Sequence, residues 1–143
     1  MYLIDTNVIS EARKRTRADA GVTAFFARAA AGDEPLYLSA VTVGELRRGV
    51  ELIRHRGDGG QADVLETWLA TALAEFGANV LPFDVDAAQV WGRLRVPHSQ
   101  HELDKQIAAI ALIHDLTVVT RNTADFAGTG VKLMNPFHMT GKP

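Results

Sequence analysis

The 143-residue sequence contains no cysteine. This absence excludes disulfide bonds, thiolate metal sites, iron–sulfur clusters and thiol nucleophiles. Long apolar runs are also missing, because stretches without charge such as 35–44 and 106–114 are far shorter than the roughly 18 residues of a membrane-spanning helix. No basic and then apolar leader precedes the acid at the fifth residue, so no signal peptide is predicted. These absences predict a soluble, cytoplasmic protein.

Neither sign of charge dominates, since 15 Lys and Arg stand against 17 Asp and Glu, for a formal net charge of -2. This balance argues against a histone-like or purely electrostatic nucleic-acid binder. The chain has 47% hydrophobic residues and no internal repeat or low-complexity linker. Independent domains commonly run to about 100–150 residues, so we expect a single domain over residues 1–143.

Short apolar runs alternate with longer amphipathic patterns along the chain. Strands are predicted at 2–4, 36–38, 80–81, 117–120 and 131–134. Helices are predicted at 6–13, 18–31, 42–56, about 62–76, from Asp84 to before Pro97, and at 102–114. The Gly-rich patch 57–60 is interpreted as a helix stop followed by a flexible connection. Strands separated by helices predict an α/β fold of three layers, with a central parallel sheet of four to five short strands covered on both faces.

Oxygen-bearing side chains gather where such a sheet carries its functional sites, beyond the carboxyl ends of the strands. Asp5 directly follows the first strand, and Asn122 and Asp125 follow the fourth. Glu45 and Asp104 lie near the amino ends of helices entered from the same edge. Crowded carboxylates raise one another's pKa unless a cation neutralises them. Oxygen ligands without cysteine favour Mg²⁺ or Mn²⁺ over zinc, and such ions activate water for attack on phosphate.

Each acid also has a purely structural explanation. Asp5 suits the capping position of the helix that follows it. Glu45 completes a capping-box pattern with Thr42, in which its carboxylate reaches back to a backbone N–H. Asp104 is an acid in a first helical turn, which the helix dipole favours, and Asp125 suits an ordinary turn. Only the joint placement of the four acids favours the functional interpretation.

Four segments and a closing element follow one another along the chain. They are LIDTNVIS at 3–10, LSAVTVGELRRG at 38–49, LDKQIAAIAL at 103–112, TRNTADF at 120–126, and Asn-Pro-Phe at 135–137. Together they resemble the motifs of PIN-domain nucleases, notably the VapC- and FitB-type toxins of bacterial toxin–antitoxin pairs. The resemblance spans nearly the whole chain with its motifs in order.

The resemblance implies a PIN-like fold and a Mg²⁺-dependent endoribonuclease, with Mn²⁺ as a substitute ion, in a bacterial cytoplasm. Asp5, Glu45 and Asp104 would be the metal-binding acids. Thr6 and Thr120 would support them through hydroxyl hydrogen bonds. The implied partners are a cognate antitoxin of the VapB or FitA kind, an RNA substrate such as tRNA or rRNA, and a second copy of the chain in a homodimer or a larger toxin–antitoxin complex, with no membrane involved.

The fourth ligand position varies within the family. Some relatives carry Asp where this sequence has Asn122, whereas others combine Asn there with an acid three residues later, as here. The preferred assignment makes Asn122 a neutral ligand or water-positioning group, with Asp125 as a carboxylate beyond the direct ligands. One fewer negative charge among the ligands weakens a second Mg²⁺ site, so the choice between one ion and two stays open.

Basic residues are concentrated in the first part of the chain. Through residue 56 there are nine against seven acids, and six against ten follow. Eleven of the fifteen are Arg, which suits bidentate contact with phosphate. The candidates for contact with an RNA backbone are Arg13, Lys14, Arg15, Arg17 and Arg48. The alternative for any single Arg is an ordinary ion pair on a solvated helix, such as Arg47 with Glu51.

The sequence argues against three other functional hypotheses. His98 and His101 form a His-x-x-His pair, but without cysteine or a companion helix the pair does not predict a zinc site. A non-catalytic PIN-like module that binds RNA or protein would have no chemical reason to keep mutually repelling acids. A haloacid-dehalogenase-type phosphotransferase needs a second Asp two residues after its nucleophile, where this sequence has Asn7.

Overall fold

The computed structural model describes residues 1–138, and the last part of the predicted domain, 139–143, lies outside the described residues. Its elements in chain order are β1 (Tyr2–Ile4), α1 (Thr6–Ala12), η1 (Arg15–Arg17), α2 (Ala20–Ala31), β2 (Leu36–Ser39), α3 (Ala40–His55), α4 (Gly59–Phe76), η2 (Gly77–Asn79), β3 (Val80–Leu81), α5 (Val85–Leu94), α6 (Glu102–His114), β4 (Thr117–Val119), η3 (Thr123–Phe126) and β5 (Lys132–Met134). Each predicted strand is present, with bounds within one residue of the prediction.

The five strands form one parallel sheet in the order β3-β2-β1-β4-β5. From β1 the chain therefore adds β2 and β3 on one side of the sheet. It then crosses over and adds β4 and β5 on the other side of β1. A crevice opens at such a reversal of strand order, outside the carboxyl ends of the strands. Here the reversal lies between β1 and β4, so the segments that follow these two strands border the crevice.

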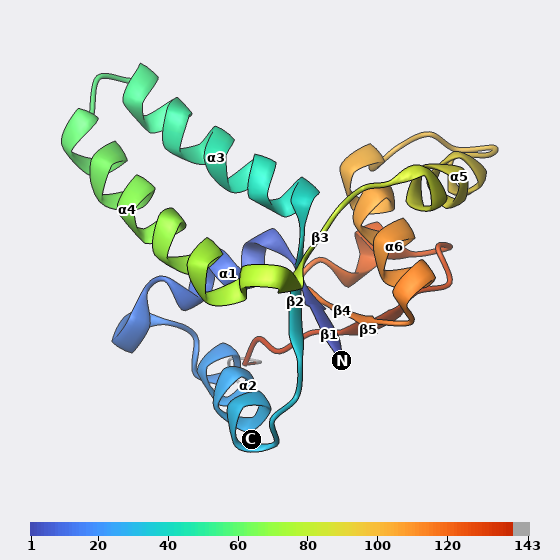
Figure 1. Ribbon diagram of the computed structural model, residues 1–143, viewed down its shortest axis with the longest axis horizontal. Coiled ribbons are helices and arrows are strands. Elements are labelled where there is room, and N and C mark those ends of the chain that lie inside the picture. The colour runs from blue at the N-terminus through green and yellow to red at the C-terminus, as the bar shows by residue number, and fades with distance from the viewer. Residues whose placement is uncertain (139–143) are drawn as a thin grey trace.

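Helices α1 to α4 lie on one side of the sheet, and α5 and α6 lie on the other (Figure 1). Ile4 and Val119 belong to a core cluster with residues of α1, α2, α3 and α4. Leu3 and Val118 belong to a second cluster with residues of α5, α6 and η3. Because successive strand side chains point to opposite faces, both faces of the sheet are covered, and the predicted three-layer α/β/α fold is confirmed.

Helices α3 and α4 form a long antiparallel pair (Figure 1). The prediction of a flexible connection over 57–60 was wrong, because α4 already begins at Gly59. Asp58 caps this helix, its carboxylate accepting a hydrogen bond from the backbone N–H of Gln61 at 3.2 Å. Gly57 makes the turn with a φ of 93°, a left-handed conformation that glycine adopts without steric cost.

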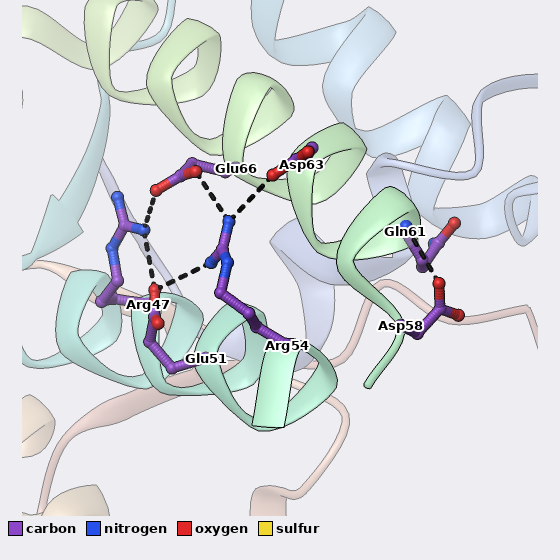
Figure 2. Close-up of polar contacts among 7 residues, drawn as sticks. All are labelled: Arg47, Glu51, Arg54, Asp58, Gln61, Asp63 and Glu66. Carbon is purple, nitrogen blue, oxygen red and sulfur yellow. Dashed lines mark hydrogen bonds and ion pairs between the residues drawn. The ribbon is translucent and has the colours of Figure 1, made fainter. Parts of the chain in front are cut away.

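A network of ion pairs joins α3 to α4 (Figure 2). Arg47 pairs with Glu51 of its own helix at 3.3 Å and with Glu66 of α4 at 2.6 Å. Arg54 contacts Glu51 at 3.3 Å, and it reaches Asp63 at 3.1 Å and Glu66 at 2.9 Å on α4. The predicted pair between Arg47 and Glu51 is therefore part of a larger set that holds the two helices together.

The segment after β5 returns across the amino end of α2. The carboxylate of Asp19 accepts hydrogen bonds from the backbone N–H groups of Gly21 at 2.8 Å, Val22 at 3.1 Å and His138 at 2.8 Å. The guanidinium of Arg121 lies 4.7 Å from the centre of the Phe137 ring. The C-terminal segment is thus fastened at two neighbouring residues, Phe137 and His138. Over residues 1–138, none of the helices has the length and apolar character needed to cross a membrane.

Candidate active site

Asp5 is held in one orientation at the carboxyl end of β1. Its Oδ1 accepts a hydrogen bond from the Thr6 backbone N–H at 2.8 Å. Its Oδ2 accepts from the Thr120 hydroxyl at 2.8 Å and from the Asn7 amide at 3.2 Å. Only 4% of Asp5 is exposed. Asp5 does cap α1, but the bonds from Thr120 and Asn7 go beyond what capping requires, and they aim the carboxylate into the crevice region.

Asn7 was not predicted as a site residue. Its amide nitrogen also donates to the Thr120 hydroxyl at 3.2 Å, and its Oδ1 accepts from the Arg121 backbone N–H at 3.0 Å. The side chain therefore ties the start of α1 to the segment after β4. Its position two residues after Asp5, at the end of the same strand, was the available signal.

The Glu45 side chain contacts Thr6, the residue after Asp5, and not the amino end of its own helix. Helix α3 is capped by Ser39, whose hydroxyl accepts from the Thr42 backbone N–H at 2.9 Å. The capping-box explanation of Glu45 was therefore wrong, since Thr42 lies inside the helix. The Thr6 hydroxyl instead donates to Glu45 Oε1 at 2.8 Å. This bond links the first turn of α1 to the second turn of α3.

Asp104 and Asp125 come together on the other side of the crevice with a residue that was not predicted to join them. Asp104 lies in the first turn of α6, and Asp125 lies in η3. His101, at the amino end of α6, has its Nδ1 3.8 Å from Asp104 Oδ2 and 3.9 Å from Asp125 Oδ1. Asn122 is exposed and is tied to the site by its backbone N–H, which donates to the Thr120 hydroxyl at 3.0 Å.

Three of these acids, Asp5, Glu45 and Asp104, have raised pKa values. Burial raises the pKa of Asp104 to about 6, and the negative charges of Asp5, Asp125 and Glu45 act in the same direction. The nearby His101 opposes them. Burial also raises the pKa values of Asp5 and Glu45, against the hydrogen bonds described above. A divalent cation among these oxygens would remove the repulsion, and carboxylates are donors that Mg²⁺ and Mn²⁺ accept. The donor set fits such an ion.

The raised pKa of Asp104 predicts that Asp104→Asn stabilises the metal-free protein at neutral pH. The ordinary pKa of an Asp carboxyl is 3.8, against about 6 for Asp104 in the folded chain. The folded state thus holds this proton more tightly, so the stability it contributes is complete below about pH 4 and is lost as the pH rises through about 6. We expect the free energy of unfolding of Asp104→Asn to exceed the wild-type value by on the order of 1–2 kcal/mol at about pH 7.5.

Urea denaturation in EDTA at about pH 4 and pH 7.5 measures this difference. The gain is expected to shrink towards zero at the lower pH, where the carboxyl is protonated. Asp115→Asn is the matched control, because Asp115 is an exposed acid at the other end of α6 with a left-handed backbone that Asn tolerates. An equal gain at both pH values, or none at either, would contradict the electrostatic explanation.

Two of the predicted RNA-contact residues lie close to the acids. Arg13 is half-buried and lines a cavity of about 170 Å³ together with Thr6 and Glu45. Arg48 is exposed on α3, three residues after Glu45. Residues three apart share a helix face, so Arg48 extends the face that Glu45 presents.

The remaining candidates surround η1. Lys14 pairs with Glu11 at 2.9 Å, so its charge is partly engaged. Arg15 and Arg17 are exposed, and Arg15 has a left-handed backbone with a φ of 56°. The cluster therefore contributes exposed guanidinium groups from the connection between α1 and α2.

Comparison with known proteins agrees with the fold and the motifs. The PIN domain family matches residues 2–132. Toxin FitB of Neisseria gonorrhoeae is 38% identical over 96% of this chain and 99% of its own length. A VapC ribonuclease of Sinorhizobium fredii is 35% identical over 96% of this chain and 98% of its own. The crystal structure of FitAcB from Neisseria gonorrhoeae superposes with a TM-score of 0.80 at 38% identity, covering 97% of this chain and 100% of that one. The chain therefore belongs to the PIN-domain family and is a homologue of the FitB and VapC toxins.

Proposed function

We propose that this protein is a metal-dependent endoribonuclease that acts as the toxin of a toxin–antitoxin pair. The observation that carries the proposal is the convergence of Asp5, Glu45, Asp104 and Asp125, from four separate segments, at one edge of the sheet. The negative charges of Asp5, Asp125 and Glu45 raise the pKa of Asp104, and a bound cation would offset this repulsion. The names of the FitB and VapC relatives supply the second support.

In this proposal the ion is Mg²⁺, or Mn²⁺ in its place, held by Asp5, Glu45 and Asp104 with Asn122 as a neutral ligand. The ion would supply the positive charge that hydrolysis of a phosphodiester requires. The chain's own contribution is preorganisation. Thr120 and Asn7 hold the Asp5 carboxylate before any ligand arrives, so little reorganisation is needed when charge develops on the substrate.

Thr6 has the corresponding role for Glu45. Its hydroxyl donates to Glu45 at 2.8 Å, and its backbone N–H donates to Asp5 at 2.8 Å. One residue thus sets the relative positions of two acids that come from different elements. We propose that Thr6 and Thr120 are positioning residues, which act on the reaction through these carboxylates.

We further propose that the RNA backbone crosses the rim of this site. Guanidinium groups bind phosphate in a bidentate manner. The proposed contacts are Arg13, Lys14, Arg15, Arg17 and Arg48. Structured RNA such as tRNA or rRNA is the proposed substrate class, and the bacterial cytoplasm is the proposed compartment. An antitoxin of the FitA or VapB kind is the proposed partner, in a complex built on a homodimer.

Chelation tests the proposal. Purified protein is expected to cleave RNA with Mg²⁺ or Mn²⁺, to lose all cleavage in EDTA, and to regain it when the ion is added back, as measured on a gel of end-labelled RNA. Circular dichroism in EDTA serves as the control that the fold survives chelation. Cleavage that is indifferent to EDTA would refute the metal-dependent mechanism. Binding of RNA without cleavage in any of the ions would favour the non-catalytic module instead.

A further inference from the structure

The imidazole of His101 lies between two carboxylates without forming a hydrogen bond to either. Its Nδ1 is 3.8 Å from Asp104 and 3.9 Å from Asp125, and one donor atom from each of the three residues lies within 4.8 Å of the others. These separations are longer than a hydrogen bond, which spans about 2.7–3.2 Å. Two donors bound to one ion at about 2.1 Å each lie about 3.0 Å apart when adjacent and about 4.2 Å apart when opposite. The observed distances lie between these two values, so small rotations of the three side chains would bring their donor atoms onto one ion.

His101 holds this position with a backbone that its residue type disfavours. It occupies the N-cap position of α6 with a φ of 57° and a ψ of 49°, and its side chain makes no capping hydrogen bond. A left-handed conformation costs a non-glycine residue on the order of 1 kcal/mol, and Ser, Thr, Asp or Asn would cap the helix better. Local helix chemistry thus does not account for His at this site, whereas a use for the imidazole does.

The loop that carries His101 is anchored on both sides. The Lys105 side chain is buried, with 8% exposed, and its ammonium donates to the His98 carbonyl. The Trp91 indole N–H of α5 donates to the Glu102 carbonyl at 3.1 Å. These bonds fix the backbone just before and just after His101. The ring is consequently presented to Asp104 and Asp125 by a supported segment, as a preformed ligand site requires.

We propose that His101, Asp104 and Asp125 bind a divalent cation through one imidazole nitrogen and two carboxylate oxygens. The proposal rests on the proposed function and deepens it, because it makes Asp125 a direct ligand and adds a nitrogen donor to an otherwise oxygen-only site. Imidazole suits transition ions, whereas Mg²⁺ prefers oxygen donors. The site therefore favours Mn²⁺ over Mg²⁺, and the half-buried Asp125, three residues beyond Asn122, gains a chemical role.

A simpler role for His101 is that of a protonated counter-ion to the two acids. The two roles differ in one measurable respect, because only a ligand places its nitrogen in contact with the metal. Pulsed electron paramagnetic resonance of the full chain loaded with Mn²⁺ detects a directly bound imidazole as nitrogen modulation. Titration of the metal-free protein with Mn²⁺, with the free Mn²⁺ measured at each step, gives the dissociation constant for Mn²⁺. Competition by Mg²⁺ in the same titration gives the dissociation constant for Mg²⁺.

The wild-type protein is expected to show nitrogen modulation, and His101→Ala is expected to lose it and to bind Mn²⁺ at least about tenfold more weakly. Mg²⁺ affinity is expected to change less than about threefold, because Mg²⁺ gains little from the nitrogen. His101→Gly is the second variant, since glycine adopts the left-handed backbone freely and keeps α6 in place. His98→Ala, which removes an exposed imidazole of the same loop, is expected to match the wild type.

A wild-type spectrum without nitrogen modulation, or modulation that persists in both His101 variants, would overturn the assignment. These readouts do not depend on catalysis. Nitrogen modulation in a protein that cleaves no RNA would support this inference while refuting the proposed function. RNA cleavage in Mg²⁺ by a protein without nitrogen modulation would refute this inference while supporting the proposed function.

Discussion

Asp5→Asn is expected to lower the single-turnover rate of RNA cleavage at least about a thousandfold. The substitution keeps the size of the side chain but removes the one nearly fully buried charge of the site. An amide oxygen is a weaker ligand for a hard cation than a carboxylate, so both ion affinity and charge stabilisation fall together. Cleavage of a defined RNA at saturating Mg²⁺, with enzyme in excess, measures the effect.

The fold is expected to survive this change. The amide oxygen can still accept from the Thr6 backbone N–H, which retains the cap of α1. The new amide nitrogen loses the hydrogen bonds from Thr120 and Asn7, but the burial that penalises the Asp5 charge no longer applies, which offsets part of that loss. Asp33→Asn is the matched control, because it removes an exposed acid with a left-handed backbone far from the acids in sequence. A rate for Asp5→Asn within tenfold of wild type would remove Asp5 from the proposed reaction.

Gly21→Ala is expected to lower the free energy of unfolding by about 2–3 kcal/mol. A Cβ at Gly21 would lie 2.1 Å from the Pro136 carbonyl oxygen and 2.6 Å from the His138 nitrogen. Both are backbone atoms, so no side-chain rotation relieves the overlap. The C-terminal segment must move away from α2, which also breaks the hydrogen bond from His138 to Asp19. Urea denaturation at neutral pH measures the loss.

Gly92→Ala provides the comparison for this prediction. Gly92 lies inside α5, and a Cβ there meets no atom within 4 Å. Alanine is favoured over glycine inside a helix, so this variant is expected to gain up to about 1 kcal/mol. If Gly21→Ala were as stable as the wild type, the close crossing of residues 135–138 over α2 would not hold in solution.

The elements were predictable because their signals are local. Apolar runs bounded by Gly and polar residues marked the strands, and the alternation of strands and helices implied the parallel sheet. The start of α4 was predicted too late because Gly59 and Gly60 are weak helix formers. In the structure, the cap from Asp58 and the packing of α4 on α3 outweigh that preference. Tertiary contacts, which composition does not display, decided this boundary.

The candidate site was predictable only in part. The rule that functional sites lie beyond the carboxyl ends of parallel strands was enough to group Asp5, Glu45, Asp104 and Asp125. For Glu45 the capping-box pattern left a structural alternative open, which the bond from Thr6, a residue distant in sequence, and the cap at Ser39 remove. The position of His101 beside these acids could not be predicted from the sequence. Its direction depends on a left-handed backbone and on the packing of η3 beside α6, neither of which a spacing of residues encodes.

The ion pairs between α3 and α4 affect how the ionic-strength dependence of this protein is to be interpreted. Arg47 and Arg54 hold α3 on α4 through charges at the surface (Figure 2). They follow Glu45 on α3 by two and nine residues. Added salt screens exposed ion pairs. It also weakens the binding of phosphates, because the counterions that binding releases gain less entropy in a more concentrated salt solution. The dependence of RNA affinity on salt concentration therefore combines two effects. One is the weaker binding of the RNA phosphates, and the other is the weaker attachment to α4 of the helix that carries Glu45. Mn²⁺ affinity in the absence of RNA, followed over the same salt range, separates the second from the first.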